Sequence, residues 1–289
     1  MLLYAQALVS GLVSAGVLTL IAVGFSLQWR SLRIVNLAHF SLVLLAAYVT
    51  YGLSTWSGLD PFLTLVVVVP GFAVAAMGVQ WIYDRFKVSL FNSLLLSFAL
   101  FILAEGLIRR FWGADFRSIP VDVNPYGVKS IVIFDVAVPI PAFIAFVVAI
   151  PVAVGGAAFL RNSYFGKGLR AVAQDREIAV AYGVNYRRIA MLLAAASGAI
   201  AGLAGMLVAI STSVFPNASE AWIGLVFAVV ILGGIGSPTG AFVGAILVGV
   251  ITNFGSTLWG LPAAQLITFL LLIGVLLWRP TGLFARLRT

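Results

Sequence analysis

The chain has 289 residues, of which 62% are hydrophobic and only 9% are charged. Its mean hydropathy of +1.13 excludes a water-soluble fold, because such a fold could not cover that much apolar surface. The formal net charge is +8, and in a membrane chain basic residues mark the cytoplasmic side, so no nucleic-acid partner is needed to explain them. The chain has no cysteine, which excludes disulfides, thiol catalysis and cysteine metal sites.

Long, continuous apolar runs predict an all-α polytopic membrane protein, because barrel strands would alternate apolar and polar residues. The first run has no basic residue before it and is too long for a signal peptide, so we expect a retained span. The run at 221–235 is short for a bilayer about 30 Å thick, which leaves eight or nine spans in a single transmembrane domain, 1–289. The runs cover residues 5–27, 36–55, 61–83, 91–111, 137–160, 189–212, 221–235, 240–258 and 262–278.

Tryptophan positions support this segmentation independently. Indole rings prefer the membrane–water interface, where one end of the ring is apolar and the other is wet. All seven tryptophans lie at the ends of the apolar runs: Trp29, Trp56, Trp81, Trp112, Trp222, Trp259 and Trp278.

The segment from Arg161 to Arg188 is the most charged part of the chain, with six of the 17 Lys and Arg residues. If this segment is cytoplasmic, alternation of the spans places 13 basic residues inside and four outside, as the positive-inside rule requires. We therefore expect the N-terminus outside, the C-terminus in the cytoplasm and the largest external loop at 113–136.

Within the charged segment, three residues have the chemistry of helix ends. Asp175 is a good N-cap, Glu177 lies in the first turn, where negative charge is favoured, and Gly183 suits the C′ position. These signals predict a separate, exposed helix of roughly seven residues, about 10 Å long. From these signals alone it is either a functional element or a solvated connection between two spans.

The run from Glu177 to Gly183 resembles the Glu-Ala-Ala loop of ABC importer permeases. Glu177, Ala179 and Gly183 match that loop at i, i+2 and i+6, while Ile178 stands where the family has its first alanine. In that family the loop is a coupling helix that sits in a cleft of the ATPase subunit. The resemblance implies six coupling residues: Arg170, Asp175, Arg176, Glu177, Ala179 and Gly183.

Four further stretches, in the same order along the chain, resemble the LivH-type permeases of branched-chain amino acid importers. The resemblance implies partners: ATP-binding cassette subunits, a second permease (a paralogue or a second copy), an external solute-binding protein and the lipid of a bacterial inner membrane. It implies no cofactor in this chain, and the chain has no phosphate-binding loop, so partner subunits would bind ATP. The stretches are Leu32–His39, Arg170–Asp175, Leu232–Gly240 and Arg279–Phe284, with Phe40 where the family usually has glycine.

Branched-chain amino acids are the expected cargo, and urea or short amides remain open, because related permeases divide among these solutes. An ion-coupled secondary transporter is less favoured, because Glu105 is the only acid clearly within a span. No catalytic constellation, cofactor site or metal site is expected, so the chain is predicted not to be an enzyme.

Polar and small residues in the spans give the remaining candidates. Asn36 and His39 share a helical face and are predicted to line the pathway or to fix the fold at a helix start, and Glu105 is expected to pair with Arg109. Regularly spaced glycines predict close helix packing, within the chain or against a second permease. They are Gly198, Gly202, Gly205, Gly236, Gly240 and Gly244.

Overall fold

The computed structural model describes residues 2–32, 35–133, 135–279 and 282. In this part of the chain, eight helices are long and apolar enough to cross a membrane, and a ninth apolar helix, α9, has 16 residues. This confirms the polytopic helical fold. The membrane-type helices are α1 (Leu2–Leu32), α2 (Ala38–Ser57), α3 (Leu65–Arg85), α4 (Leu90–Trp112), α5 (Ile140–Asn162), α8 (Tyr186–Ser211), α9 (Ala218–Gly233), α10 (Pro238–Trp259) and α11 (Leu261–Trp278).

At the two ends of the bundle, one short helix and one β-hairpin were not predicted, whereas the short helix predicted within the charged segment is present. The charged segment forms α6 (Tyr164–Gln174) followed by α7 (Arg176–Ala181), and the 113–139 region contains an antiparallel hairpin of β1 (Ser130–Ile133) and β2 (Val136–Pro139). The hairpin forms because Val136 and Val138 point to one face and are buried against α1. Residue 137 was expected to begin a span, but α5 begins only at Ile140.

Gln6 holds the hairpin against α1. Its side-chain amide donates to the carbonyl of Ala137 at 2.7 Å, and its side-chain oxygen accepts from the amide of Ala137 at 2.9 Å. Both backbone groups of Ala137 are therefore satisfied by one side chain.

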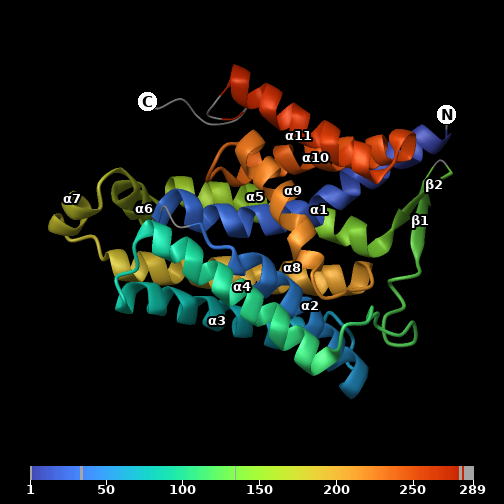
Figure 1. Cartoon of the computed structure of the whole chain (residues 1–289), viewed down its shortest axis with the longest axis horizontal. Coiled ribbons are helices and arrows are strands. Elements are labelled where there is room, and N and C mark those ends of the chain that lie inside the picture. Colours follow the sequence, from blue (N-terminus) through green and yellow to red (C-terminus); the bar gives the residue numbers. More distant parts are fainter. Residues whose placement is uncertain (1, 33–34, 134, 280–281, 283–289) are drawn as a thin grey trace.

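The helices run back and forth between two ends of the bundle (Figure 1). One end, called here the α7 end, carries α6, α7 and the last residues of α11. The other, called the hairpin end, carries the first residues of α1 and the β-hairpin. Because α9 is short, it spans only about 24 Å, and it crosses the middle of the bundle between the two groups of longer helices.

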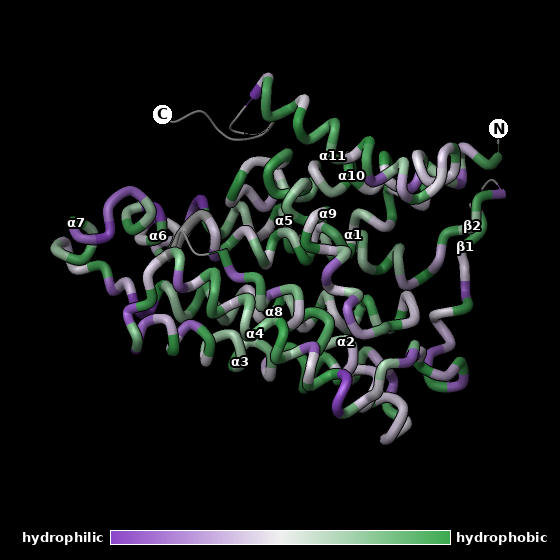
Figure 2. The backbone as a smooth tube through the Cα atoms, viewed as in Figure 1, coloured by the Kyte–Doolittle hydropathy of each residue, from purple (hydrophilic) through white to green (hydrophobic). Residues whose placement is uncertain are grey.

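Basic residues are concentrated at the α7 end, where hydrophilic segments flank the apolar helices (Figure 2). Arg109, Arg110, Arg117 and Lys129 belong to the hairpin end. Three of the 13 basic residues expected on the cytoplasmic side lie outside the described residues: Arg33, Arg286 and Arg288. The described residues at the α7 end include ten Lys or Arg: Arg30, Arg85, Lys87, Arg161, Lys167, Arg170, Arg176, Arg187, Arg188 and Arg279.

Three glycines of α8 bring its backbone close to neighbouring helices. A Cβ on Gly198 would lie 2.2 Å from the carbonyl oxygen of Phe72 in α3, and a Cβ on Gly205 would lie 2.4 Å from that of Val43 in α2. Gly202 is nearly as close to α3. Small residues allow such approaches, which stabilise helix pairs in lipid by van der Waals contact.

Glycines also form the turn between α9 and α10. A Cβ on Gly240 would lie 1.9 Å from the carbonyl oxygen of Gly233, and one on Gly244 would lie 2.5 Å from that of Val229. Gly236 instead lies in the turn itself, with φ +76°, and Ser237 caps α10 by accepting a hydrogen bond from the amide of Gly240 at 3.1 Å. Gly198, Gly202, Gly205, Gly240 and Gly244 therefore pack against their own chain.

Candidate functional site

The α6–α7 arm breaks at Asp175, as the predicted N-cap requires. Asp175 has extended backbone angles, and its side chain accepts a hydrogen bond from the amide of Ile178 at 3.0 Å. Glu177 lies in the first turn of α7. The helix has six residues, one fewer than predicted, and the cap explains why α6 does not continue into it.

Gly183 ends α7 in the way the sequence predicts. Its φ is +86°, a region that residues with a Cβ rarely adopt. Its amide donates to the carbonyl of Val180 at 2.9 Å, and the amide of Val184 donates to that of Ala179 at 3.0 Å. This pair of hydrogen bonds is the Schellman motif.

The inner face of the arm packs on the spanning helices. Leu169 and Val172 of α6 and Ala179 of α7 are buried in one apolar cluster with Ile189 and Leu193 of α8. The arm is thus seated on the α7 end of α8 by an apolar contact.

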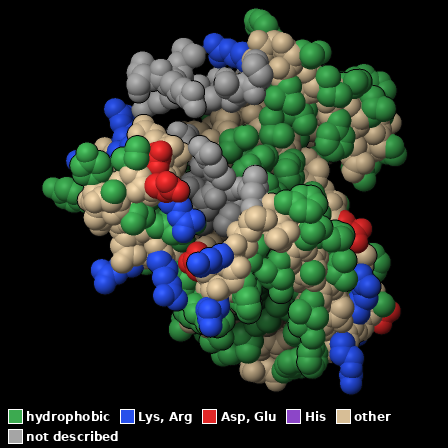
Figure 3. All heavy atoms as spheres, turned by 60° about the vertical axis from the view of Figure 1, so that its left-hand side comes forward, with side chains coloured by type: hydrophobic (Ala, Val, Ile, Leu, Met, Phe, Trp, Pro, Cys, Tyr) green, Lys and Arg blue, Asp and Glu red, His purple; other side chains and the backbone are tan. Residues whose placement is uncertain are grey.

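Among the residues that the structure describes, nothing covers the outer face of α7, which is partly apolar. Ile178 is 57% exposed, Val180 is 50% exposed and Tyr182 is 87% exposed, and Glu177 is also exposed between them. Lys and Arg side chains gather around this end of the molecule (Figure 3). An exposed apolar surface surrounded by basic side chains is typical of a protein-binding site.

Two of the predicted coupling arginines have contacts inside the chain. Arg170 donates to the carbonyls of Leu160 at 2.6 Å and Arg161 at 3.2 Å, so it caps the end of α5. The guanidinium of Arg176 lies over the ring of Tyr186, 3.6 Å from its centroid. Both arginines therefore position the arm, and α7 offers Glu177 and its apolar neighbours outward.

Asn36 and His39 lie inside the bundle, near its α7 end. The side-chain amide of Asn36 donates to the side-chain oxygen of Gln28 in α1 at 2.9 Å. The Oδ1 of Asn36 is buried without a partner in the described residues. Ser97 of α4 holds the same turn by accepting from the amide of Leu37 at 3.1 Å.

His39 joins three helices. Its Nε2 lies 3.1 Å from the carbonyl oxygen of Ile21 in α1, and its Nδ1 lies 3.2 Å from the hydroxyl of Ser197 in α8. A carbonyl can only accept, so the Nε2 of His39 donates to Ile21, and the hydroxyl of Ser197 donates its single proton to the carbonyl of Gly24 at 2.8 Å. A Cβ on Gly24 would lie 2.5 Å from the ring's Cε1, so glycine is needed there for the ring to fit.

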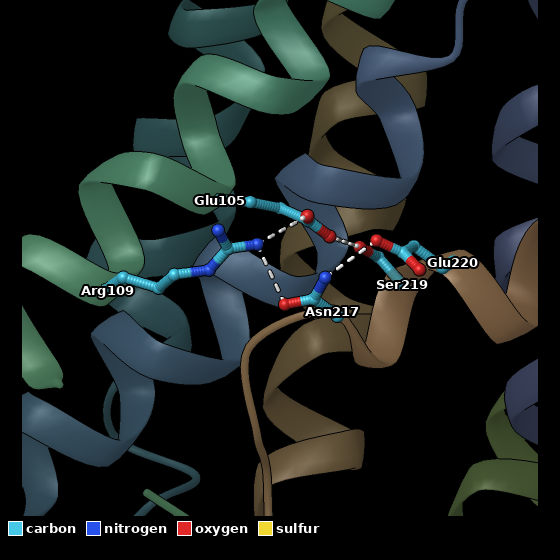
Figure 4. A network of polar contacts seen from close by, with 5 residues as sticks. All are labelled: Glu105, Arg109, Asn217, Ser219 and Glu220. Atoms are coloured by element: carbon cyan, nitrogen blue, oxygen red, sulfur yellow. Dashed lines mark hydrogen bonds and ion pairs between the residues drawn. The ribbon is translucent and has the colours of Figure 1, made fainter. Parts of the chain in front are cut away.

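Glu105 is buried in α4, and the predicted partner Arg109 lies 3.4 Å away. The structure adds three contacts (Figure 4), and two of them join α4 to residues more than a hundred positions away, which the sequence did not suggest. Ser219 of α9 donates to Glu105 at 2.5 Å, Arg109 donates to Asn217 at 2.8 Å, and Asn217 donates to Glu220 at 2.7 Å. The network joins α4 to the start of α9 at the hairpin end.

Comparison with known proteins places these features in a family. A family described as the permease component of the branched-chain amino acid transport system matches residues 7–276. The chain is 27% identical to the permease protein BraD of the high-affinity branched-chain amino acid transport system of Pseudomonas aeruginosa, over 98% of this chain and 96% of BraD.

Two further relatives carry the name LivH. The LivH permease of the same kind of system in Escherichia coli is 26% identical over 99% of this chain and 96% of its own length. A probable LivH of Methanocaldococcus jannaschii is 24% identical over 94% of this chain and 90% of its own length. No solved structure shows a significant match to this chain. The bundle of apolar helices and the near-complete family match together show that this chain is a multi-pass membrane protein of the branched-chain amino acid transport permease family.

Proposed function

We propose that this chain is the membrane-spanning subunit of an ABC importer of the cytoplasmic membrane and that α7 is its coupling helix. The observation that carries the proposal is the construction of α7. It is a six-residue helix capped at both ends, seated on α8 through Ala179, and it presents Ile178, Val180 and Tyr182 outward.

The charge distribution supports a cytoplasmic position for α7. Ten described basic residues belong to the α7 end and four to the hairpin end, and the cytoplasmic side of a membrane protein carries the excess of Lys and Arg. The first residues of α1 and the hairpin are then external, and Arg279, at the end of α11, is cytoplasmic.

Branched-chain amino acids are the proposed cargo, because the named relatives belong to branched-chain amino acid systems. Urea and short amides are the alternative cargo. The partners are two ATP-binding cassette subunits at the α7 end, a second permease in the membrane and a solute-binding protein at the hairpin end. ATP hydrolysis belongs to the cassette subunits, and closure of their dimer moves α7 and, through the shared apolar cluster, α8.

The test is made on the complete transporter, reconstituted with its ATPase subunits and solute-binding protein. Glu177→Lys reverses the charge at the tip, and Gly183→Leu places a side chain at φ +86°. Both changes should abolish leucine uptake and the stimulation of ATPase activity by the loaded binding protein, at normal expression. Retention of both activities would refute the coupling role.

Tyr164→Ala serves as a matched control for Tyr182→Ala, because the two tyrosines are 90% and 87% exposed on the same arm. Tyr164 belongs to α6 and Tyr182 directly follows α7. We expect loss of stimulation with Tyr182→Ala only. Uptake of urea in place of leucine would correct the cargo and leave the coupling role standing.

A further inference from the structure

Two serines and one asparagine lie within membrane spans, near the hairpin end of the bundle. Contact with lipid would be unfavourable for these polar side chains. Ser10 and Ser14 of α1 and Asn253 of α10 are all partly exposed, although both helices are membrane spans. Asn253 lies six residues before the end of α10, which is about 9 Å below that end of the helix. At this depth a polar side chain that faced hydrocarbon would be costly, and such groups line the bundle interior or a water-filled path.

The two helices are held together where these side chains meet. A Cβ on Gly11 would lie 2.6 Å from the Cα of Val250, and a Cβ on Gly249 would lie 2.6 Å from the carbonyl oxygen of Gly11. The amide nitrogen of Asn253 donates to the hydroxyl of Ser14 and to the carbonyl of Gly249, both at 3.0 Å. Backbone contact and hydrogen bonds thus fix the position of the Asn253 amide.

Both donor positions of the Asn253 amide are used, and its Oδ1 has no partner among the described residues. The hydroxyl of Ser14 donates to the carbonyl of Gly11, so the donors of Ser14 and Asn253 are used within the chain, and the Oδ1 of Asn253 remains as an acceptor. An acceptor of this kind suits a solute that carries N–H groups.

The opposite face of α1 is apolar. Leu8 and Leu12 are 46% and 38% exposed, and each is two positions from a serine, which places it about 200° around the helix from Ser10. One face of α1 therefore has the composition of a lipid contact, and the other does not.

We propose that Ser10, Ser14 and Asn253 line the outer half of the solute path, with the Asn253 Oδ1 as an acceptor for the N–H groups of a small polar solute. This inference rests on the proposed function for its cargo, but the position of the water-filled path does not depend on which solute is carried. The competing possibility is that these side chains only stabilise the contact between α1 and α10.

This chain has no cysteine, so a single introduced cysteine reports on one of its positions, and the transporter with the unchanged chain gives the background from the other subunits. In the complete transporter, Ser10→Cys, Ser14→Cys and Asn253→Cys are treated from outside with the membrane-impermeant reagent 2-(trimethylammonium)ethyl methanethiosulfonate, and Leu8→Cys and Leu12→Cys are the lipid-facing controls. The three path positions should react at least about tenfold faster than the controls, because a thiol in apolar surroundings stays protonated and unreactive. Equal or slower reaction would overturn the inference.

Asn253→Ser covers the case in which a cysteine variant is poorly expressed. This change removes the amide oxygen and keeps a short polar side chain, so the KM for uptake should rise several-fold. An unchanged KM would overturn the role of the Oδ1. If labelling succeeds but leucine is not transported, the proposed cargo is wrong and the path stands; if leucine is transported but labelling fails, only the path is wrong.

Discussion

The guanidinium of Arg176 lies over the ring of Tyr186, with its central carbon 3.6 Å from the ring centroid. Arg176 is the first residue of α7, and Tyr186 is the first residue of α8. The contact therefore connects the short exposed helix directly to a membrane span, across the turn that Gly183 makes. A cation over an aromatic face at an exposed site contributes about 0.5–1 kcal/mol.

Loss of this contact should loosen α7. We expect Arg176→Gln to speed hydrogen exchange of the α7 amides by roughly twofold to fivefold, the equivalent of the cation–π energy. Exchange measured by mass spectrometry on the transporter in nanodiscs tests this. Arg187→Gln is the control, because Arg187 is also exposed on this end of α8; equal acceleration by both changes would argue against the contact.

The C-terminal turn of α7 requires a positive φ. Gly183→Asn should keep both coupling and uptake, because asparagine adopts the left-handed region with little strain. Gly183→Ala should cost about 1–2 kcal/mol of local stability, because the alanine Cβ crowds the following carbonyl oxygen in the left-handed region. The readout is ATPase stimulation by the loaded binding protein, measured for both variants at equal expression. A stronger defect in the asparagine variant would contradict this account of the turn.

Gly24 and His39 should behave as one unit. Gly24→Ala places a methyl group 2.5 Å from the His39 ring, and His39→Ala removes the hydrogen bonds that link α1, α2 and α8, at a cost of about 1–3 kcal/mol. In the double variant the collision is absent, so its loss of thermal stability should be smaller than the sum of the two single losses. Thermal melting in detergent measures this, and strict additivity would show that the ring and the glycine are independent.

The Glu105 network predicts an order of severity. Ser219→Ala should cost about 1.5–3 kcal/mol, because it removes a buried hydrogen bond to a charged group. Arg109→Gln should cost about 1 kcal/mol or less, since the Arg109 side chain is 48% exposed and solvent screens its charge. The melting temperature of each variant tests the order. Glu105→Gln combined with Arg109→Gln should recover part of the loss from Arg109→Gln alone, because no unpaired charge remains in the span.

Tyr126, in the 113–136 region, has a pH response with a defined cause. The hydroxyl of Tyr126 donates to the Oδ2 of Asp60 at 2.9 Å, and this hydrogen bond raises the pKa of Tyr126 above its ordinary value. Because the folded pKa is raised, the contact is complete below a pH of about 10 and is lost as the pH rises through the folded pKa. The ultraviolet difference titration between the natural chain and Tyr126→Phe gives that midpoint, and Asp60→Asn should lower it.

The apolar runs predicted the spanning helices well because each is a long, uninterrupted hydrophobic segment. The α7 helix was also predictable, since Asp175 and Gly183 act through hydrogen bonds to residues three positions away. Local chemistry of this kind is readable in the sequence. The short length of α9 likewise followed from its run at 221–235.

Contacts between distant segments were not predictable in the same way. The partner of Glu105 that lies closest, Ser219, is 114 positions away, and the partner of His39, Ser197, is 158 positions away. The β-hairpin was missed because its two strands have four residues each and form only where α1 covers their valines. These features depend on how the helices pack, which no single segment encodes.

The double hydrogen bond between Gln6 and Ala137 has a consequence for proteins that approach the hairpin end. At Ala137, both backbone groups on the free edge of β2 are already occupied by the glutamine amide. A visiting protein therefore cannot extend this sheet by adding a strand at that position. Any protein that docked at this part of the hairpin would therefore meet side chains at Ala137's position in the edge, and not free backbone groups.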